Sequence, residues 1–147
     1  MAASDISVTL QRDHAYVLLL VVLTAFVNLW AGLKVGAARK KYDVQYPQMY
    51  AEKSDKNAKA FNCVQRAHQN FLENVPFFFA FLVTSSVYRP CFAAIAGFVR
   101  LLGFIVYIES YASGDPKKRL RGGFGYFGLL GSLVLTIEAA LKLLGFL

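Results

Sequence analysis

The sequence contains few of the residues that form disulfides or bind metal ions in small soluble domains. Its 147 residues include two cysteines, two histidines and one tryptophan. Cys63 and Cys91 are too few for a framework of several disulfides, and both lie in or beside apolar stretches. A structural zinc site takes four ligands, so it would require both cysteines and both histidines at once, and we expect no such site. We therefore expect buried or lipid-facing thiols and no metal.

Acidic residues are also scarce, with 9 Asp and Glu against 16 Lys and Arg and a formal net charge of +7. A basic surplus suits nucleic acid, but here the basic residues flank apolar stretches and no nucleic-acid-binding module fits between them. We expect no nucleic-acid partner. Hydrophobic residues make up 56% of the chain, and the mean hydropathy is +0.44. These values indicate an integral membrane protein.

The apolar residues are grouped into runs long enough to cross a bilayer, which takes about 20 residues. The sequence predicts an all-α membrane protein, a four-transmembrane-helix bundle forming a single domain over 1–147, with spans at about 12–38, 61–88, 91–112 and 120–145. The first apolar run is long, follows Arg12 and Asp13, and lacks a small-residue cleavage pattern. We therefore expect it to remain as a span rather than to be removed as a signal peptide.

Positive charge is concentrated in the two segments that join these spans on one side, 39–60 and 113–121. The first contains Arg39, Lys40, Lys41, Lys53, Lys56 and Lys59, and the second contains Lys117, Lys118, Arg119 and Arg121. Because cytoplasmic loops are enriched in Lys and Arg, we expect both segments to be cytosolic loops and both termini to lie on the other side. These cations could simply orient the chain and contact anionic lipid headgroups.

The start of the second predicted span carries polar residues in a regular pattern. On a helix, Arg66, Asn70 and Glu73 fall within about 60° of one another and form one polar stripe. His68 projects roughly opposite this stripe. A membrane helix with polar groups on two faces at the same depth needs hydrogen-bond partners on both sides. One four-helix subunit cannot readily provide both sets of partners. This argument predicts an oligomer with sites between subunits.

The third predicted span also carries polar residues on one face, because Arg100, Tyr107 and Tyr111 lie near one another around the helix. The Gly/Pro-containing segment SGDPKKRLRGG follows and is expected to form a turn that places Arg119 beside them. Arg39, Arg66 and Arg119 would then meet at one membrane face, a place suited to a small zwitterionic ligand with several carboxylates.

Each of these residues also has a purely structural interpretation. Arg66 and Glu73 could form an intramembrane salt bridge, and Asn70 an interhelical hydrogen bond. The tyrosines could belong to an interfacial aromatic belt. Arg100 and Glu138 are isolated in their spans and fit a structural role, and we expect Asn28 to serve helix packing. The density of the polar groups favours a functional role, because ionisable residues inside a membrane are energetically unfavourable and tend to mark functional sites.

The motif FNCVQRAHQNFLE at 61–73, followed by a Pro-containing apolar run, resembles the signature of the MAPEG family, the membrane-associated proteins in eicosanoid and glutathione metabolism. KVGAARKKYDVQYP at 34–47 and GDPKKRLRGG at 114–123 extend the resemblance over nearly the whole chain. The resemblance implies a homotrimer in the membrane of the endoplasmic reticulum, with glutathione as co-substrate between neighbouring subunits on the cytosolic side.

The resemblance also implies roles for single residues. The glutathione-contacting positions of the family match Arg39, Arg66, His68, Asn70, Glu73, Asn74, Tyr107 and Tyr111. Arg119 matches the arginine proposed to stabilise the glutathione thiolate, and Lys40 stands where some relatives have a second arginine with a proton-donor role. Asn74 and Phe104 depart from the tyrosine and arginine found in relatives, which counts against leukotriene formation more than against glutathione binding.

The expected function is that of a glutathione transferase acting on lipophilic electrophiles from the membrane lipid, with glutathione-dependent reduction of lipid hydroperoxides as a second activity. A leukotriene C synthase-type activity is one alternative. A non-catalytic lipid-binding scaffold of the same family is another, although a scaffold has no need of the polar set above. A channel or transporter lacks support, because the sequence has no evident inverted repeat or pair of broken helices.

Overall fold

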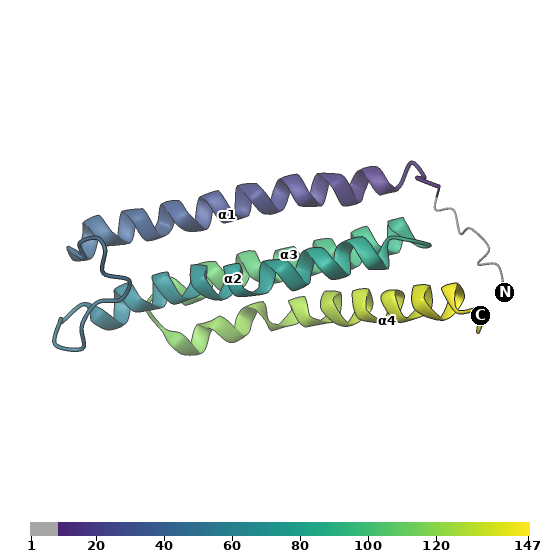
Figure 1. The fold of residues 1–147 in the computed structure, drawn as a ribbon. Coiled ribbons are helices and arrows are strands. Elements are labelled where there is room, and N and C mark those ends of the chain that lie inside the picture. Colours follow the sequence, from purple (N-terminus) through teal and green to yellow (C-terminus); the bar gives the residue numbers. More distant parts are fainter. Residues whose placement is uncertain (1–8) are drawn as a thin grey trace.

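The described part of the computed structural model, residues 9–147, consists of four long helices and one short one. These are α1 (His14–Tyr42), α2 (Ala58–Ser85), α3 (Pro90–Tyr111) and α4 (Gly125–Leu143), with the 3-10 helix η1 (Pro116–Phe124) leading into α4. They form an elongated up-and-down bundle (Figure 1), and residues 9–147 contain no strand. The predicted all-α class is confirmed.

Three of these helical segments are long and apolar enough to cross a membrane: α1, α3, and η1 together with α4. This result and the long apolar runs indicate an integral membrane protein. α2 has 28 residues, but its first half carries the polar motif, which lowers its hydropathy. It packs against α1, α3 and α4, and its assignment as a fourth span stays a prediction.

The two basic segments lie at one end of the bundle. The connection between α1 and α2 and the helix η1 both lie at the end of the bundle opposite to the start of α1 and the end of α4 (Figure 1). α1 ends where Asp43 adopts a left-handed conformation, with φ of 56° and its backbone N–H bonded to the Arg39 carbonyl. The predicted topology requires both basic segments to lie at the same end of the bundle, as they do. The compartment that this end faces stays a prediction.

The segment predicted as a turn at 113–121 differs from expectation, because most of it belongs to η1. The Asp115 side chain accepts a hydrogen bond from the backbone N–H of Lys117 at 3.0 Å, and Pro116 occupies the first helical position. Both features favour the start of a helix. As a result Arg119 lies on a short helix whose position is fixed against α3.

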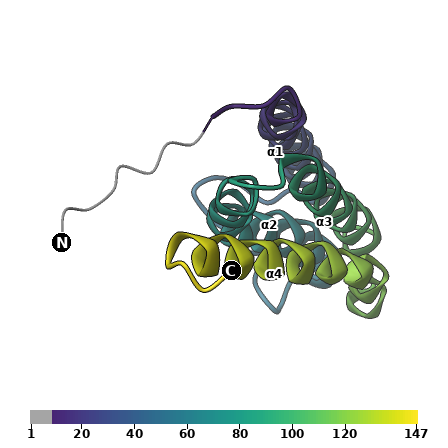
Figure 2. The ribbon, with the colours of Figure 1, turned by 90° about the vertical axis from the view of Figure 1, so that its right-hand side faces the viewer.

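Glycines allow α4 and η1 to approach α3 closely. A Cβ atom on Gly125 would lie 2.9 Å from Gly103 Cα, and one on Gly122 would lie 2.6 Å from Tyr107 Cβ. Viewed along the bundle, α4 crosses obliquely over α2 and α3 (Figure 2). Between α2 and α3 the core is aromatic, with the Phe71 and Phe104 rings packed edge to face at 5.2 Å. This close packing positions the residues of the site.

Candidate functional site

A cavity of about 250 Å³ lies between α2, α3 and η1, near the end that carries the basic segments. We call it the α3–η1 cavity. Its polar and aromatic lining consists of Asn70, Arg100, Phe104, Tyr107, Arg119 and Tyr126. Each of the helices α2, α3 and α4 contributes at least one of these side chains, and η1 contributes Arg119. The cavity therefore depends on the packing of α2, α3, η1 and α4.

Several of the predicted site residues meet at this cavity. Asn70, Tyr107 and Arg119 line it directly. Tyr111 packs edge to face against Tyr107, with ring centroids 5.6 Å apart. The Arg119 guanidinium carbon lies 5.8 Å from the centre of the Tyr111 ring. The structure thus brings together residues from α2, α3 and η1. The two that are farthest apart in the sequence, Asn70 and Arg119, are separated by 49 positions.

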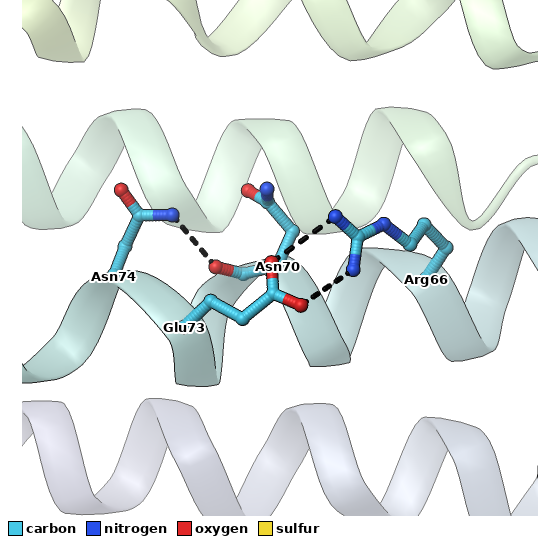
Figure 3. Close-up of polar contacts among 4 residues, drawn as sticks. All are labelled: Arg66, Asn70, Glu73 and Asn74. Atoms are coloured by element: carbon cyan, nitrogen blue, oxygen red, sulfur yellow. Dashed lines mark hydrogen bonds and ion pairs between the residues drawn. The ribbon is translucent and has the colours of Figure 1, made fainter.

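In the polar stripe of α2, Arg66 and Glu73 form the salt bridge that the sequence analysis gave as their structural interpretation. Arg66 donates to both carboxylate oxygens of Glu73, at 2.7 and 3.1 Å (Figure 3). The side chains are 40% and 45% exposed, so the pair is accessible from the surface. An exposed pair contributes little to stability. Its exposure makes both charged groups accessible to a ligand that approaches this face of α2.

Asn74 connects the same stripe to α3. Its amide nitrogen donates to the Asn70 carbonyl at 2.8 Å, as Figure 3 shows, and its amide oxygen accepts from Arg100 Nη2 at 3.2 Å. Both ends of the side chain are therefore used within the chain. The structure places Asn74 beside the buried arginine rather than among the exposed groups of the stripe.

Arg39 and Lys40 lie at the same end of the bundle but line a different hollow, beside Tyr46. The Arg39 guanidinium donates to the Gln48 carbonyl at 2.8 Å and lies 4.3 Å from the Tyr46 ring centre. α1 packs on α2 and α3, whereas η1 packs on α3 and α4. Within one chain, therefore, Arg39 does not join Arg119 at the α3–η1 cavity.

His68 faces α1, where its Nε2 atom lies 3.0 Å from Asn28 Oδ1. The expectation that a second polar face on α2 would lack a partner inside one subunit is therefore wrong. Asn28 on α1 supplies that partner, and His68 is directed away from the α3–η1 cavity toward α1. The expected packing role of Asn28 agrees with this contact.

Replacing Asn28 by leucine is expected to lower the free energy of unfolding by about 1 kcal/mol, because His68 would lose its interhelical hydrogen bond. The midpoint of unfolding in a series of detergent mixtures measures the change. Leu29→Ala is a suitable control, because Leu29 is 60% exposed on the outer face of the same helix. An Asn28→Leu protein that is as stable as the parent would show that the bond has no net stabilising effect.

Two side chains of the cavity, Arg100 and Tyr126, are not among the predicted site residues. Arg100 had been given a structural role, yet it lines the cavity and lies 4.7 Å from the Tyr126 ring centre. The signal was present, because Arg100 shares one helical stripe with Tyr107 and Tyr111. Tyr126 had no such signal, since it lies at the start of an apolar run.

The cysteines do not contribute to this site. Cys63 is buried and Cys91 is exposed, and both are free thiols. Over residues 9–147, no three His, Cys, Asp or Glu side chains are grouped closely enough to hold a metal ion. The chemistry available at the cavity is that of arginine, amide and phenol side chains.

Comparison with known proteins agrees with this architecture. The model of the MAPEG family matches residues 17–141. An uncharacterized protein of Synechocystis sp. is 35% identical over 127 residues, which cover 86% of each chain. The matched region includes the whole α3–η1 cavity and the α2 stripe. The chain therefore belongs to the MAPEG family, which includes glutathione transferases and related enzymes.

Proposed function

We propose that this protein is a membrane-bound glutathione transferase that joins glutathione to lipophilic electrophiles, with reduction of lipid hydroperoxides as a second activity. The observation that carries the proposal is that Asn70, Tyr107 and Arg119 line one cavity, with Tyr111 packed against Tyr107, in a chain of the MAPEG family. Guanidinium groups bind carboxylates, and amide and phenol groups complete the hydrogen bonds of a peptide. This set of donors suits a tripeptide with two carboxylates.

Arg119 is the proposed catalytic residue. Glutathione supplies a thiol, and a free thiol has a pKa near 8.5, so most of it is protonated at neutral pH. A nearby cation favours the thiolate, which is the nucleophile. Arginine keeps its charge at every working pH and acts here by electrostatics alone. The side chain of Arg119 is exposed at the edge of the cavity, where a water-soluble tripeptide enters.

The proposed assembly is a homotrimer in which neighbouring chains share each glutathione site. Arg39 and Lys40 line a hollow of their own at the same end of the bundle as the α3–η1 cavity. A second copy that brings this hollow against the cavity would add Arg39 to the binding groups and Lys40 as a proton donor. His68 would contribute through its contact with α1, and Arg66 with Glu73 through the exposed stripe of α2.

The finer assignment within the family follows the motifs. KVGAARKKYDVQYP and GDPKKRLRGG resemble microsomal glutathione S-transferase 3 in particular. By the positive-inside rule, the glutathione site faces the cytosol, and likeness to the family favours the endoplasmic reticulum. An electrophile dissolved in the bilayer then reaches the thiolate from the lipid side. This arrangement gives a physical reason for an enzyme built inside the membrane.

Purified protein assayed with glutathione and three substrates tests the proposal: a chloronitroaromatic, a fatty-acid hydroperoxide and an allylic epoxide of arachidonate. We expect conjugation of the first and reduction of the second. Turnover of the epoxide alone would instead favour a leukotriene C synthase-type activity. Saturable lipid binding with no glutathione-dependent turnover of any substrate would favour the scaffold and contradict the proposal.

A further inference from the structure

Arg100 is a buried cation inside the bundle, and no acidic side chain of residues 9–147 forms an ion pair with it. The residue is 6% exposed, and the ion pairs found over the described part of the chain join other side chains. On α3 it lies seven residues before Tyr107, which places it about 10 Å farther from the basic end of the bundle along the helix axis. A charge buried at such a depth without a counter-charge is unfavourable and tends to mark a functional site.

The guanidinium group of Arg100 is held in a defined position by three helices. Its central carbon lies 4.2 Å from the Phe104 ring centre on α3 and 4.7 Å from the Tyr126 ring centre on α4. Nη2 donates to Asn74 Oδ1 on α2 at 3.2 Å. Aromatic rings interact with the faces of a guanidinium, so the N–H groups in its plane stay available for hydrogen bonds. The bond to Asn74 uses one of the five N–H donors.

The α3–η1 cavity holds two positive charges and no negative one. Arg100 and Arg119 both line it, and within residues 9–147 no Asp or Glu side chain belongs to its lining. In the proposed function, a glutathione thiolate beside Arg119 balances one of these charges. The charge of Arg100 is left over, in a place where burial makes an electrostatic interaction stronger than it is in water.

The two arginines lie at different depths of the cavity. Arg119 is exposed at its edge, on η1, whereas Arg100 is buried on the membrane side. Glutathione carries charges at both ends, which favours a position at the exposed edge, whereas an electrophile dissolved in the bilayer arrives from the membrane side. A sulfur atom beside Arg119 therefore has Arg100 on the side from which the electrophile approaches.

We propose that Arg100 is a second catalytic residue, which stabilises the negative charge that develops on oxygen atoms of the electrophile as the thiolate attacks. This assignment rests on the proposed function and specifies the second substrate: an electrophile with a nitro or hydroperoxide group whose oxygen takes up the charge. Fixed N–H donors in a site with little water suit this role, because they need no reorientation during the reaction. The planar guanidinium matches two adjacent oxygens, such as those of a nitro group.

Both activities of the proposed function create such a charge. In conjugation of a chloronitroaromatic, a C–S bond forms and a pair of ring electrons moves onto the nitro oxygens; the pair returns as the C–Cl bond breaks and chloride leaves. In hydroperoxide reduction, an S–O bond forms to the outer oxygen as the O–O bond breaks, and the inner oxygen leaves as an alkoxide that takes a proton from water. Sulfur is oxidised to a sulfenic acid, which a second glutathione converts to the disulfide with release of water.

The addition of glutathione to 1,3,5-trinitrobenzene tests the role of Arg100 on the purified full-length protein. A C–S bond forms, the charge moves onto the nitro oxygens and no group leaves, so the coloured anionic adduct reports an equilibrium rather than turnover. We expect the parent protein to form the adduct from bound thiolate with a constant about tenfold or more above that of free thiolate, the range of one charge-assisted hydrogen bond. Arg100→Gln should remove most of this gain and leave the ultraviolet absorbance of bound thiolate within about twofold of the parent value.

Two further variants separate charge from position. Arg100→Lys keeps the charge without the planar fork, and we expect an intermediate formation constant. Arg121→Gln removes the same charge from an exposed position on η1 and should retain the parent value. If Arg100→Gln weakens glutathione binding but leaves the formation constant per bound thiolate unchanged, Arg100 binds a glutathione carboxylate and the inference is overturned.

The parent protein alone provides a decisive result even if Arg100→Gln does not fold. A parent protein that shows the thiolate absorbance but forms the adduct no better than free thiolate overturns the role of Arg100 and leaves the proposed function standing. A parent protein without saturable thiolate absorbance overturns both. The two absorbance measurements therefore distinguish failure of this inference from failure of the proposed function.

Discussion

Replacing Arg119 by alanine is expected to lower the turnover number of glutathione conjugation about 100-fold, the usual effect of removing one group that stabilises developing or bound negative charge. Glutathione should still bind, because Asn70 and Tyr107 remain at the cavity. We expect the thiol to keep its proton at neutral pH, because the cation proposed to stabilise the thiolate is lost. Steady-state kinetics with the chloronitroaromatic, together with calorimetric titration of glutathione, separates turnover from binding.

Arg121→Ala is the matched control for this experiment. Arg121 lies on the same helix η1, is exposed, and does not line the α3–η1 cavity. The substitution removes the same charge from the same basic segment, so a general effect on the surface potential would appear in both variants. Equal losses in Arg119→Ala and Arg121→Ala would contradict a specific role for Arg119.

Replacing Gly128 by leucine is expected to prevent folding or to lower the free energy of unfolding by about 3 kcal/mol or more, at the upper end of overpacking effects. A Cβ atom at Gly128 would contact the Ala96 carbonyl oxygen and lie 2.6 Å from the backbone nitrogen of Arg100. These neighbours are backbone atoms of α3 and cannot move aside without separating α3 from α4. The midpoint of thermal unfolding in detergent measures the effect.

Gly131→Ala provides the comparison on the same helix. A Cβ atom there would lie 3.5 Å from the Ala96 side chain, an ordinary van der Waals distance. Alanine also favours the helix over glycine by roughly 0.5–1 kcal/mol, so we expect unchanged or slightly raised stability. A Gly128→Leu protein as stable as the parent would show that α3 and α4 do not pack as closely as described.

The helices and the stripe on α2 could be predicted from the sequence because both depend on local patterns. Apolar runs fix the approximate positions of helices in a membrane protein. The spacing of Arg66, Asn70 and Glu73 places them on one face whatever the rest of the fold does. The ion pair between the first and last of these is therefore a local feature, and it was one of two alternatives that the sequence left open.

The contacts between helices could not be predicted in the same way. Periodicity placed Arg100 with Tyr107 on α3, but it does not show that this face meets Tyr126 at the start of α4. The partner of His68 also depends on how α1 packs on α2, which sets the distance to Asn28. Helix η1 was missed because Gly and Pro were interpreted as a turn, although Asp115 and Pro116 are typical of a helix start.

The ultraviolet absorbance of the glutathione thiolate on the purified protein tests the central claim most directly. We expect a saturable thiolate signal when glutathione is added at neutral pH, no signal with S-methylglutathione, and loss of most of the signal in Arg119→Ala. A protein that gives no saturable signal, or an Arg119→Ala variant whose signal equals that of the parent, would contradict the claim that this cavity holds glutathione ionised beside Arg119.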